Sequence, residues 1–510
     1  MAGPEHETLP GSAHGGGIAP APPAARLEFS LPPEDLPRLV RLPGLLRSGR
    51  TARVDLAWHD TADGALAARN RSLCGLGPTE PWRLEALHPS PALFWPPAGP
   101  PPLLAEAAET ALAPSLPGPV HAIASFRGCR HSFANLDADQ QPGPVEVVVH
   151  EGHLRGPATI RPLCRVQLAG PPGAVAEQVA ALGAAVRLAV PRAGLAAEAV
   201  ALAQGTEPPP GHLGLPQVSP GQPLSTAIAL VMGSLVGVML HWAVTAGDGN
   251  SPVPVHQMRV ATRRLRSALS IFKHPAACPQ TAPLGAALRV TAAQLGAARD
   301  WDVFLTGIGA QVLETFPDDP RLAALMAAGQ RRRAKAYAAL RDHLGGAAFR
   351  TVSLSLACAA NLRPWDGLDP AQDHVLQADA TGFAAEVLAR RLHRVRRAGR
   401  GLRHLPVPAL HELRKDCKRL RYAAEFFTPL FPAKPGRRFL RHLGALQEAL
   451  GLLNDGAATA GLMAQLGRTG EGYAAGLVNG FVAGGSGATR AAVRQAWHDF
   501  RHADPFWAQG

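Results

Sequence analysis

Two rows of cationic side chains, 155 residues apart, are the residues of this chain best suited to chemistry. The first row opens the segment HQMRVATRRLR, and the second opens HELRKDCKRLR. In a helix, residues spaced i, i+3, i+7 and i+10 fall within about 80° of one another, so each row would occupy one side. The first cationic row is His256, Arg259, Arg263 and Arg266, and the second cationic row is His411, Arg414, Lys418 and Arg421. Three secondary cations flank the rows: Arg264, Lys415 and Arg419.

Both rows predict a polyanionic ligand. Like charges one helical turn apart destabilise a helix by about 0.2 to 0.5 kcal/mol per pair, and a purely structural helix has no reason to carry this cost twice. A bound polyanion removes it, because arginine forks bind two phosphate oxygens, lysine adds a point charge, and histidine donates to phosphate in either protonation state. The alternative is a solvated Arg-rich face that is paired with nearby acids: Asp300, Asp302, Asp416 and Asp455.

The rows need helices to carry them, and an internal repeat indicates which ones. The segment LGAARD ends at Asp300 and the segment LGLLND ends at Asp455, again 155 residues apart. Two independent matches at one offset indicate a duplication. We therefore predict two copies of a helical bundle, each with one cationic helix and one helix that ends in an acidic corner.

Domain organisation follows from changes in the pattern of apolar residues. Residues 1–24, rich in Gly, Pro and Ala, are predicted to be a disordered tail. Residues 25–203 alternate β-type runs with Gly/Pro turns, which is an α+β pattern. A Pro/Gly-rich linker is predicted at residues 204–222. The helical pattern of residues 223–505 is broken near five prolines: Pro275, Pro317, Pro364, Pro406 and Pro432.

The charge is divided unequally between these parts. The 510 residues carry a net charge of +12, and from Pro223 onward 35 Lys and Arg face 20 Asp and Glu, which leaves 16 against 19 before it. A basic surplus confined to one domain is the footprint of a polyanion: nucleic acid, an anionic membrane surface or a polyphosphate. Against nucleic acid, the cationic rows lack interleaved aromatic residues for stacking bases, and the sequence shows no helix-turn-helix, zinc or RNA-binding signature.

One apolar segment, Ala227 to Val244, is long enough to span a bilayer. Gly233, Ser234, Gly237 and His241 interrupt it, and neither flank carries a cluster of Lys or Arg. We therefore predict a buried bundle helix and no membrane span. The six cysteines are far apart, without a Cys-x-x-Cys pair, and no secretory leader is recognisable, so they are predicted to be reduced thiols of a cytoplasmic protein.

The segments HQMRVATRRLR, LGAARDWDVFL, HELRKDCKRLRYAAEFF and LQEALGLLND resemble the CHAD domain, the conserved histidine α-helical domain. The resemblance implies two four-helix-bundle repeats around a basic cavity, and binding of inorganic polyphosphate. By position, it implies that both cationic rows supply ligands of phosphate. The expected fold class is therefore an α+β domain followed by an all-α domain of two four-helix-bundle repeats.

Residues 25–203 resemble, in the order of their elements, the CYTH domain that often precedes a CHAD domain. CYTH domains are β-tunnels that hydrolyse triphosphates with Glu-x-Glu-x-Lys on the first strand, and with arginines and further glutamates for metal. LEFSLPPEDLPRLV, WHDTAD and VEVVVHEG match its elements in order. The opening strand keeps one carboxylate, Glu28, and no lysine, so the resemblance implies a degenerate CYTH-like β-tunnel without catalysis. Arg127 and Arg130 survive on a predicted strand and could contact an anion weakly.

The sequence thus predicts a binder of inorganic polyphosphate, cytoplasmic and associated with polyphosphate granules, rather than an enzyme. No catalytic residue, metal ligand or cofactor is predicted, and Mg²⁺ or Mn²⁺ would be needed only for an active N-terminal domain. Two alternatives stay open. One is a metal-dependent inorganic triphosphatase with an altered tunnel, and the other is a nucleic-acid binder with weak, steeply salt-dependent affinity. The sequence does not predict the oligomeric state.

Overall fold

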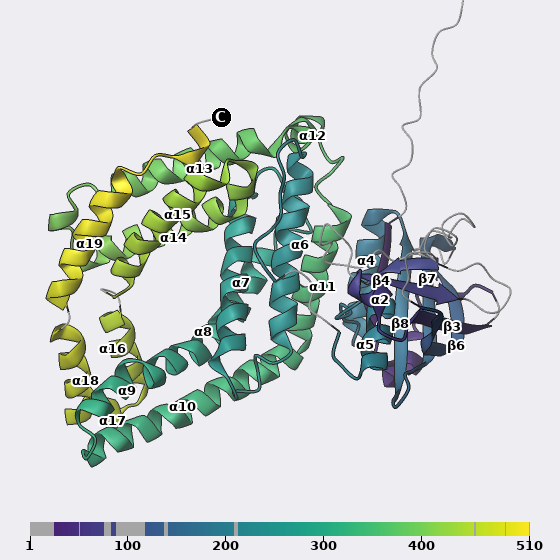
Figure 1. Ribbon diagram of the computed structural model, residues 1–510, viewed down its shortest axis with the longest axis horizontal. Coiled ribbons are helices and arrows are strands. Elements are labelled where there is room, and N and C mark those ends of the chain that lie inside the picture. The colour runs from purple at the N-terminus through teal and green to yellow at the C-terminus, as the bar shows by residue number, and fades with distance from the viewer. Residues whose placement is uncertain are drawn as a thin grey trace, which may run out of the picture.

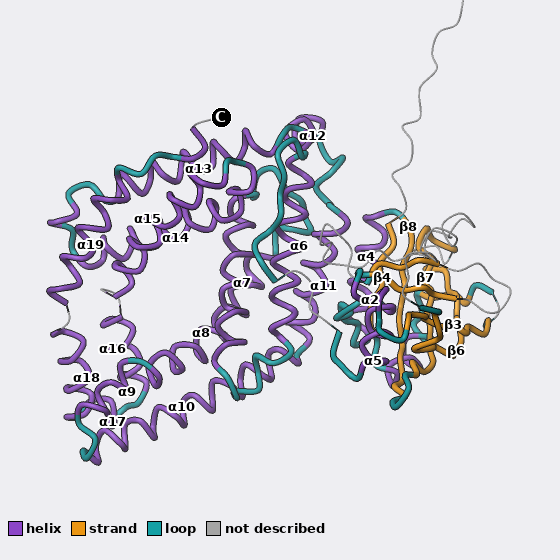
Figure 2. The backbone as a smooth tube through the Cα atoms, in the orientation of Figure 1, coloured by secondary structure: helices purple, strands orange, loops and turns teal. Residues whose placement is uncertain are grey.

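An N-terminal curled antiparallel sheet is followed by a mostly helical C-terminal region (Figure 1, Figure 2). The structure is a computed structural model that describes residues 25–49, 51–75, 83–87, 118–136, 141–208, 213–452, 455–484 and 486–508. The predicted tail, residues 1–24, lies outside the described residues.

Within the described residues, the sheet has eight strands in the order β1-β8-β7-β6-β3-β4-β5, with β2 paired to β6. Neighbouring strands pair antiparallel, and the long strands β6, β7 and β8 form its middle. The strands are β1 (Ala25–Ser30), β2 (Leu45–Arg47), β3 (Ala52–Thr61), β4 (Arg71–Gly75), β5 (Arg83–Ala86), β6 (Val120–Leu136), β7 (Pro142–Arg155) and β8 (Ile160–Gly170). Two short helices, α1 (Leu36–Leu39) and α2 (Ala65–Ala68), lie between early strands.

A helix covers each face of the sheet. Successive side chains of a strand point to opposite faces, so both faces can carry apolar residues. Phe29 and Val166 lie on one face, in the hydrophobic core that includes α4 (Pro172–Ala185). Trp58 lies on the other face, in a second core that includes α5 (Leu195–Gln204). Both faces are therefore packed against protein.

The predicted proline breaks all fall between helices of the C-terminal region. Helix α7 ends at Ile271 before Pro275, and α14 begins at Val407 after Pro406. The helices are α6 (Leu224–Ala243), α7 (Pro252–Ile271), α8 (Leu284–Thr306), α9 (Ile308–Thr315), α10 (Pro320–Gly345), α11 (Ala347–Leu362), α12 (Pro370–Gln377), α13 (Ala380–Ala398), α14 (Val407–Phe427), α15 (Ala433–Leu452), α16 (Asp455–Gln465), α17 (Arg468–Glu471), α18 (Tyr473–Gly484) and α19 (Ser486–Arg501).

Helix α6 contains the apolar segment that was weighed as a membrane span. In the described part of the chain, it is the one helix long and apolar enough to cross a membrane, and 67% of its apolar window is buried inside the protein. It packs against α7 and α11, with Ile228, Val231 and Leu235 buried in the core. A helix covered by neighbours on several sides needs such a composition without any membrane.

Helix α4 joins the sheet to the helical region. It packs against α11, where a Cβ added to Gly183 would lie 2.7 Å from Leu354 Cδ1. One continuous hydrophobic core extends from Phe29 of β1 to Phe427 of α14. The predicted linker lies between α5 and α6, but the two parts are also joined by this apolar contact.

The helices are arranged as a closed frame (Figure 1). Helices α6, α7 and α11 form the side next to the sheet, α13, α14 and α15 the next side, and α16, α18 and α19 the side opposite the sheet. Helices α8, α9 and α10 form the fourth side, where a third hydrophobic core joins them to α16 and α18. Trp301 and Leu325 meet Leu462 and Val478 in that core, so segments far apart in sequence close the frame.

Candidate polyanion-binding site

The first cationic row lies on α7. The helix begins at Pro252, and Ser251 Oγ accepts a hydrogen bond from the Val253 backbone N–H at 3.2 Å, which makes Ser251 the N-cap. Met258 and Leu265 on its apolar face are fully buried. The four residues of the row are half-buried or exposed, because they lie off this face.

The second cationic row lies on α14. Leu413, Cys417 and Leu420 are fully buried, and the four cations of the row are half-buried. Helices α7 and α14 pack against each other, so the structure brings the two rows onto neighbouring helices.

Arg259 lies against helix α8. A Cβ added to Gly296 would lie 2.6 Å from Arg259 Nη1, and Arg259 Nη2 is 3.7 Å from Asp300 Oδ1. Burial lowers the pKa of Arg259; Asp300 opposes this shift, whereas Arg263 and Arg299 add to it. The lowered pKa means that the positive charge of this guanidinium is less well stabilised here than in water. An anionic ligand would stabilise the charge.

Other members of the first row are also near arginines. Burial lowers the pKa of His256 below 6.5, and Arg299 on α8 and the arginines of the row lower it further. Burial and the neighbouring Arg289 lower the pKa of Arg266. Within the described residues, the buried Nε of Arg263 has no hydrogen-bond partner. The row therefore combines desolvation with mutual repulsion.

Helix α15 lies beside the second row as α8 lies beside the first. A Cβ added to Gly451 would lie 3.5 Å from Arg414 Nη2. Arg421 Nη1 donates a hydrogen bond to Gln447 Oε1 at 3.2 Å. Gly296 and Gly451 are separated by the same 155 residues as the two rows, so equivalent arginines rest on equivalent glycines.

A buried carboxylate links α7 to α14. Glu425 is 6% exposed and accepts hydrogen bonds from Arg264 Nη2 at 2.7 Å and from Arg421 Nε at 2.9 Å. Arg264, predicted as a secondary cation, is thus paired with a residue 161 positions away. Glu425 was missed by the sequence analysis, because it lies outside the matched positions of the repeat. Its spacing of four residues from Arg421 is a local signal of one partner, but nothing in the local sequence indicates Arg264 as the other.

The other two secondary cations are paired on α14 itself. Lys415 Nζ is 2.8 Å from Glu412 Oε1 on an exposed part of the helix. Arg419 Nη1 donates to Asp416 Oδ1 at 2.8 Å. These contacts compensate the flanking charges locally.

The acids of the solvated-face alternative have different roles. Asp300 is half exposed and lies 3.7 Å from Arg259. Asp302 is buried and accepts hydrogen bonds from Arg333 and Tyr337 of α10, away from the row. The side chain of Asp455 lies outside the described residues.

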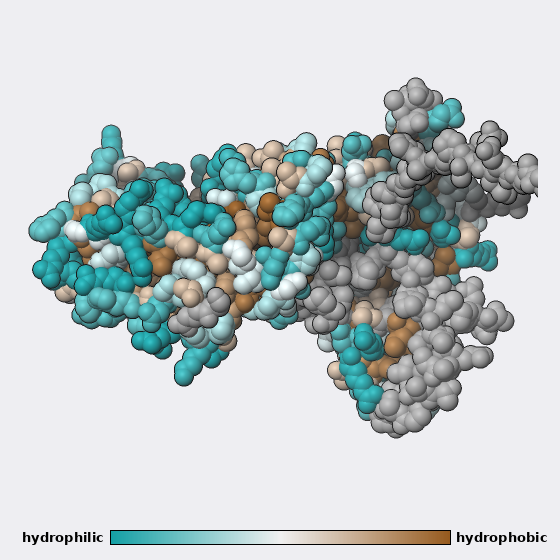
Figure 3. Space-filling model, turned by 90° about the horizontal axis from the view of Figure 1, so that it is seen from above, coloured by the Kyte–Doolittle hydropathy of each residue, from teal (hydrophilic) through white to brown (hydrophobic). Residues whose placement is uncertain are grey.

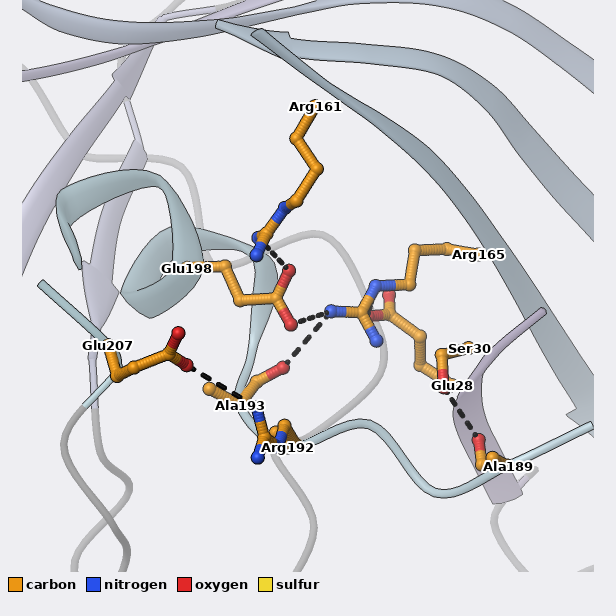
Figure 4. Close-up of polar contacts among 9 residues, drawn as sticks. All are labelled: Glu28, Ser30, Arg161, Arg165, Ala189, Arg192, Ala193, Glu198 and Glu207. Carbon is orange, nitrogen blue, oxygen red and sulfur yellow. Dashed lines mark hydrogen bonds and ion pairs between the residues drawn. The ribbon is translucent and has the colours of Figure 1, made fainter. Parts of the chain in front are cut away.

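The N-terminal sheet holds a buried ion cluster (Figure 4). Arg165 of β8 is 2% exposed; its Nη2 donates to Glu198 Oε1 of α5 at 2.6 Å, and its Nε is 3.7 Å from Glu28 Oε1 of β1. Gln167 Nε2 donates to Glu28 Oε2 at 2.8 Å, and Arg161 also contacts Glu198. The remaining carboxylate of the opening strand is therefore engaged by protein groups, and the cluster ties α5 to the sheet.

The two arginines predicted to contact an anion in this domain have acidic neighbours. Arg127 Nε is 3.3 Å from Asp55 Oδ2, and Arg130 Nη2 is 3.6 Å from Glu146 Oε1. In the part of the chain that the structure describes, no group of three or more His, Cys, Asp or Glu side chains could hold a metal ion.

The surface of the helical region is mostly hydrophilic where Figure 3 shows it, with hydrophobic residues in small separate groups.

Residues 232–464, which include both cationic rows, match the family model of the CHAD domain. The chain contains a CHAD domain. The predicted family of the helical region is thereby confirmed, and the CHAD domain carries every residue of the candidate site.

Two solved structures are similar to part of the chain. The crystal structure of the CHAD domain from the plant Ricinus communis is 28% identical, with a TM-score of 0.48, and the match covers 57% of this chain and 96% of the plant domain. PptA from Streptomyces chartreusis is 17% identical, with a TM-score of 0.42, and the match covers 54% of this chain and 99% of that protein. No curated protein shows significant similarity to the chain.

Proposed function

We propose that the CHAD domain of this protein binds inorganic polyphosphate on the cationic rows of α7 and α14. The observation that carries the proposal is the state of the first row, where burial and neighbouring arginines lower the pKa values of His256, Arg259 and Arg266. Guanidinium groups that are partly desolvated and close to one another are costly in the free protein, and a chain of phosphates offers one compensating charge after another.

The same proposal includes two four-helix-bundle repeats. This part of the proposal is supported by the matching positions of α8 beside α7 and of α15 beside α14. In each pair, a glycine of the neighbouring helix, Gly296 or Gly451, lies next to an arginine of the cationic row. A duplicated bundle would supply two equivalent phosphate-binding helices, and a linear polyanion could contact both. The proposed location is the cytoplasm, on polyphosphate granules.

For the N-terminal sheet, we infer a degenerate CYTH-like tunnel that does not hydrolyse triphosphate. Hydrolysis in such a tunnel needs several carboxylates that are free to hold Mg²⁺ or Mn²⁺. Glu28 instead lies beside Arg165 and accepts a hydrogen bond from Gln167, while α5 packs against the face of the sheet that bears these residues.

The first test is a titration of the full chain with long-chain polyphosphate, and with DNA of matched charge, at about 0.15 M salt, near physiological ionic strength. Wild-type protein is expected to bind polyphosphate much more tightly than DNA. Each charge-assisted hydrogen bond contributes about 1.5 to 3 kcal/mol, so Arg259→Ala/Arg414→Ala is expected to weaken polyphosphate binding by more than about 100-fold.

The matched control is Arg331→Ala/Arg332→Ala, which removes the same charge from an exposed part of α10. It is expected to retain nearly all of the affinity. Equal affinity for both polymers would favour the nucleic-acid alternative. An equal loss of polyphosphate affinity in both double variants would mean that the cationic rows bind only as part of a generic basic surface.

A further inference from the structure

Two glycines lie beneath the guanidinium groups of equivalent arginines. Gly296 is in α8 and Gly451 is in α15, and each occupies the second position of the segment that begins LG. A Cβ at Gly296 would lie 2.6 Å from Arg259 Nη1, and a Cβ at Gly451 would lie 3.5 Å from Arg414 Nη2. The two contacts recur at the 155-residue offset of the cationic rows.

Helix packing does not explain the first glycine. Apart from chain neighbours and the backbone of α8 itself, a Cβ at Gly296 would meet nothing within 4 Å among the described residues except the tip of Arg259. Glycine is the poorest helix former after proline, so a glycine in a helix interior needs a reason. The space that it leaves is used by the guanidinium, which lies along α8 from Gly296 toward Asp300.

We propose that Gly296 is a positioning residue that holds Arg259 close to the backbone of the neighbouring helix, ready for a polyanion, and that Gly451 occupies the equivalent place beside Arg414. This inference rests on the proposed function of the rows. Without Gly296, the flexible end of Arg259 has to move, because within the described residues no other atom beyond the helix's own backbone and chain neighbours lies within 4 Å of the added Cβ. At Gly451 an added Cβ would make an ordinary van der Waals contact with Arg414, so Arg414 could keep its place. Gly296 therefore acts on binding through Arg259.

The decisive experiment is a double-mutant cycle with Gly296→Ala and Arg259→Ala, read out by binding of long-chain polyphosphate to the full chain. Gly296→Ala is expected to weaken binding about tenfold, close to the loss of one phosphate contact. In the Arg259→Ala background, the same substitution is expected to have no further effect, because the group that it displaces is gone.

Gly285→Ala is the matched control, because Gly285 is in the same helix and a Cβ there would meet nothing within 4 Å. It is expected to leave binding unchanged, and thermal unfolding of both variants should occur no earlier than in the wild type. Gly451→Ala is expected to leave binding nearly unchanged, since its added Cβ would lie 3.5 Å from Arg414 Nη2, an ordinary van der Waals distance, against 2.6 Å for Gly296 and Arg259.

The outcomes separate the two proposals. If wild-type protein does not bind polyphosphate, the proposed function fails first. If wild-type protein binds but Gly296→Ala binds equally well, or weakens binding as much in the Arg259→Ala background, the positioning role is wrong while the function stands.

Discussion

His256 is mostly uncharged in the free protein at neutral pH, because burial and the guanidinium groups of Arg299, Arg263 and Arg259 hold its pKa below 6.5. Because this pKa is lower in the folded than in the unfolded state, protonation of His256 favours the unfolded state. The free energy of unfolding therefore decreases as the pH falls below 6.5. A bound polyanion acts in the opposite direction and raises this pKa, because it offers negative charge to the imidazolium.

Binding of polyphosphate should therefore take up a proton at His256. We expect the affinity of the wild type to rise as the pH is lowered from neutral to below 6.5, and His256→Gln to make this rise shallower. Calorimetric titration in buffers of different ionisation enthalpy measures the protons taken up. The same proton uptake in the wild type and in His256→Gln would contradict a role for this side chain.

At the scale of the helix, α8 carries two acids with separate tasks. Asp300 lies toward the first cationic row, 3.7 Å from Arg259. Asp302 is 2% exposed and accepts hydrogen bonds from Arg333 Nε at 2.7 Å and from Tyr337 Oη at 2.8 Å, which fixes α8 against α10. Burial and the hydrogen bond to Asp302 raise the pKa of Tyr337 to about 12, so it stays a donor.

The two acids should respond differently to loss of charge. Asp302→Asn is expected to lower the free energy of unfolding by about 1 to 3 kcal/mol, because it weakens two hydrogen bonds to a buried carboxylate, both of them charge-assisted. Asp300→Asn is the matched control and should leave stability unchanged, because its carboxylate is half exposed. Urea unfolding of both variants measures this difference, and an equal effect would contradict the division of roles.

Helices were largely predictable because their signals are local. The cationic rows lie on α7 and α14 as the i, i+3, i+7, i+10 spacing predicted, and the proline breaks separate helices. The partner of a charge was not predictable in this way. In the sequence, Arg264 is one more cation of a basic segment. Only the packing of α7 against α14 brings Arg264 within hydrogen-bond distance of Glu425.

At the scale of the whole molecule, the N-terminal part shows the same limit. Residues 25–203 were expected to be an α+β domain, and their described part contains the curled sheet and the helices α4 and α5. The contact of Arg165 with Glu198 joins residues 33 positions apart on different elements. Sequence order alone could not indicate that α5 would pack on the sheet and engage its interior charge.

The state of this sheet leads to a prediction for the whole chain. Purified protein with Mg²⁺ or Mn²⁺ is expected to release no phosphate from tripolyphosphate above the background, because Glu28 is held by Arg165 and Gln167. A colorimetric phosphate assay measures this release, with Glu28→Gln as the control. Metal-dependent release that Glu28→Gln abolishes would support the triphosphatase alternative instead.

The third hydrophobic core has a consequence for synthesis of the chain. Trp301, Phe304 and Leu325 are covered partly by residues of α16 and α18, and Leu462 is made 137 residues after Leu325. At about 5 to 20 residues per second, the ribosome needs about 7 to 27 seconds to make that stretch. For that interval, the part of this core that α16 and α18 cover in the folded protein stays open in the nascent chain.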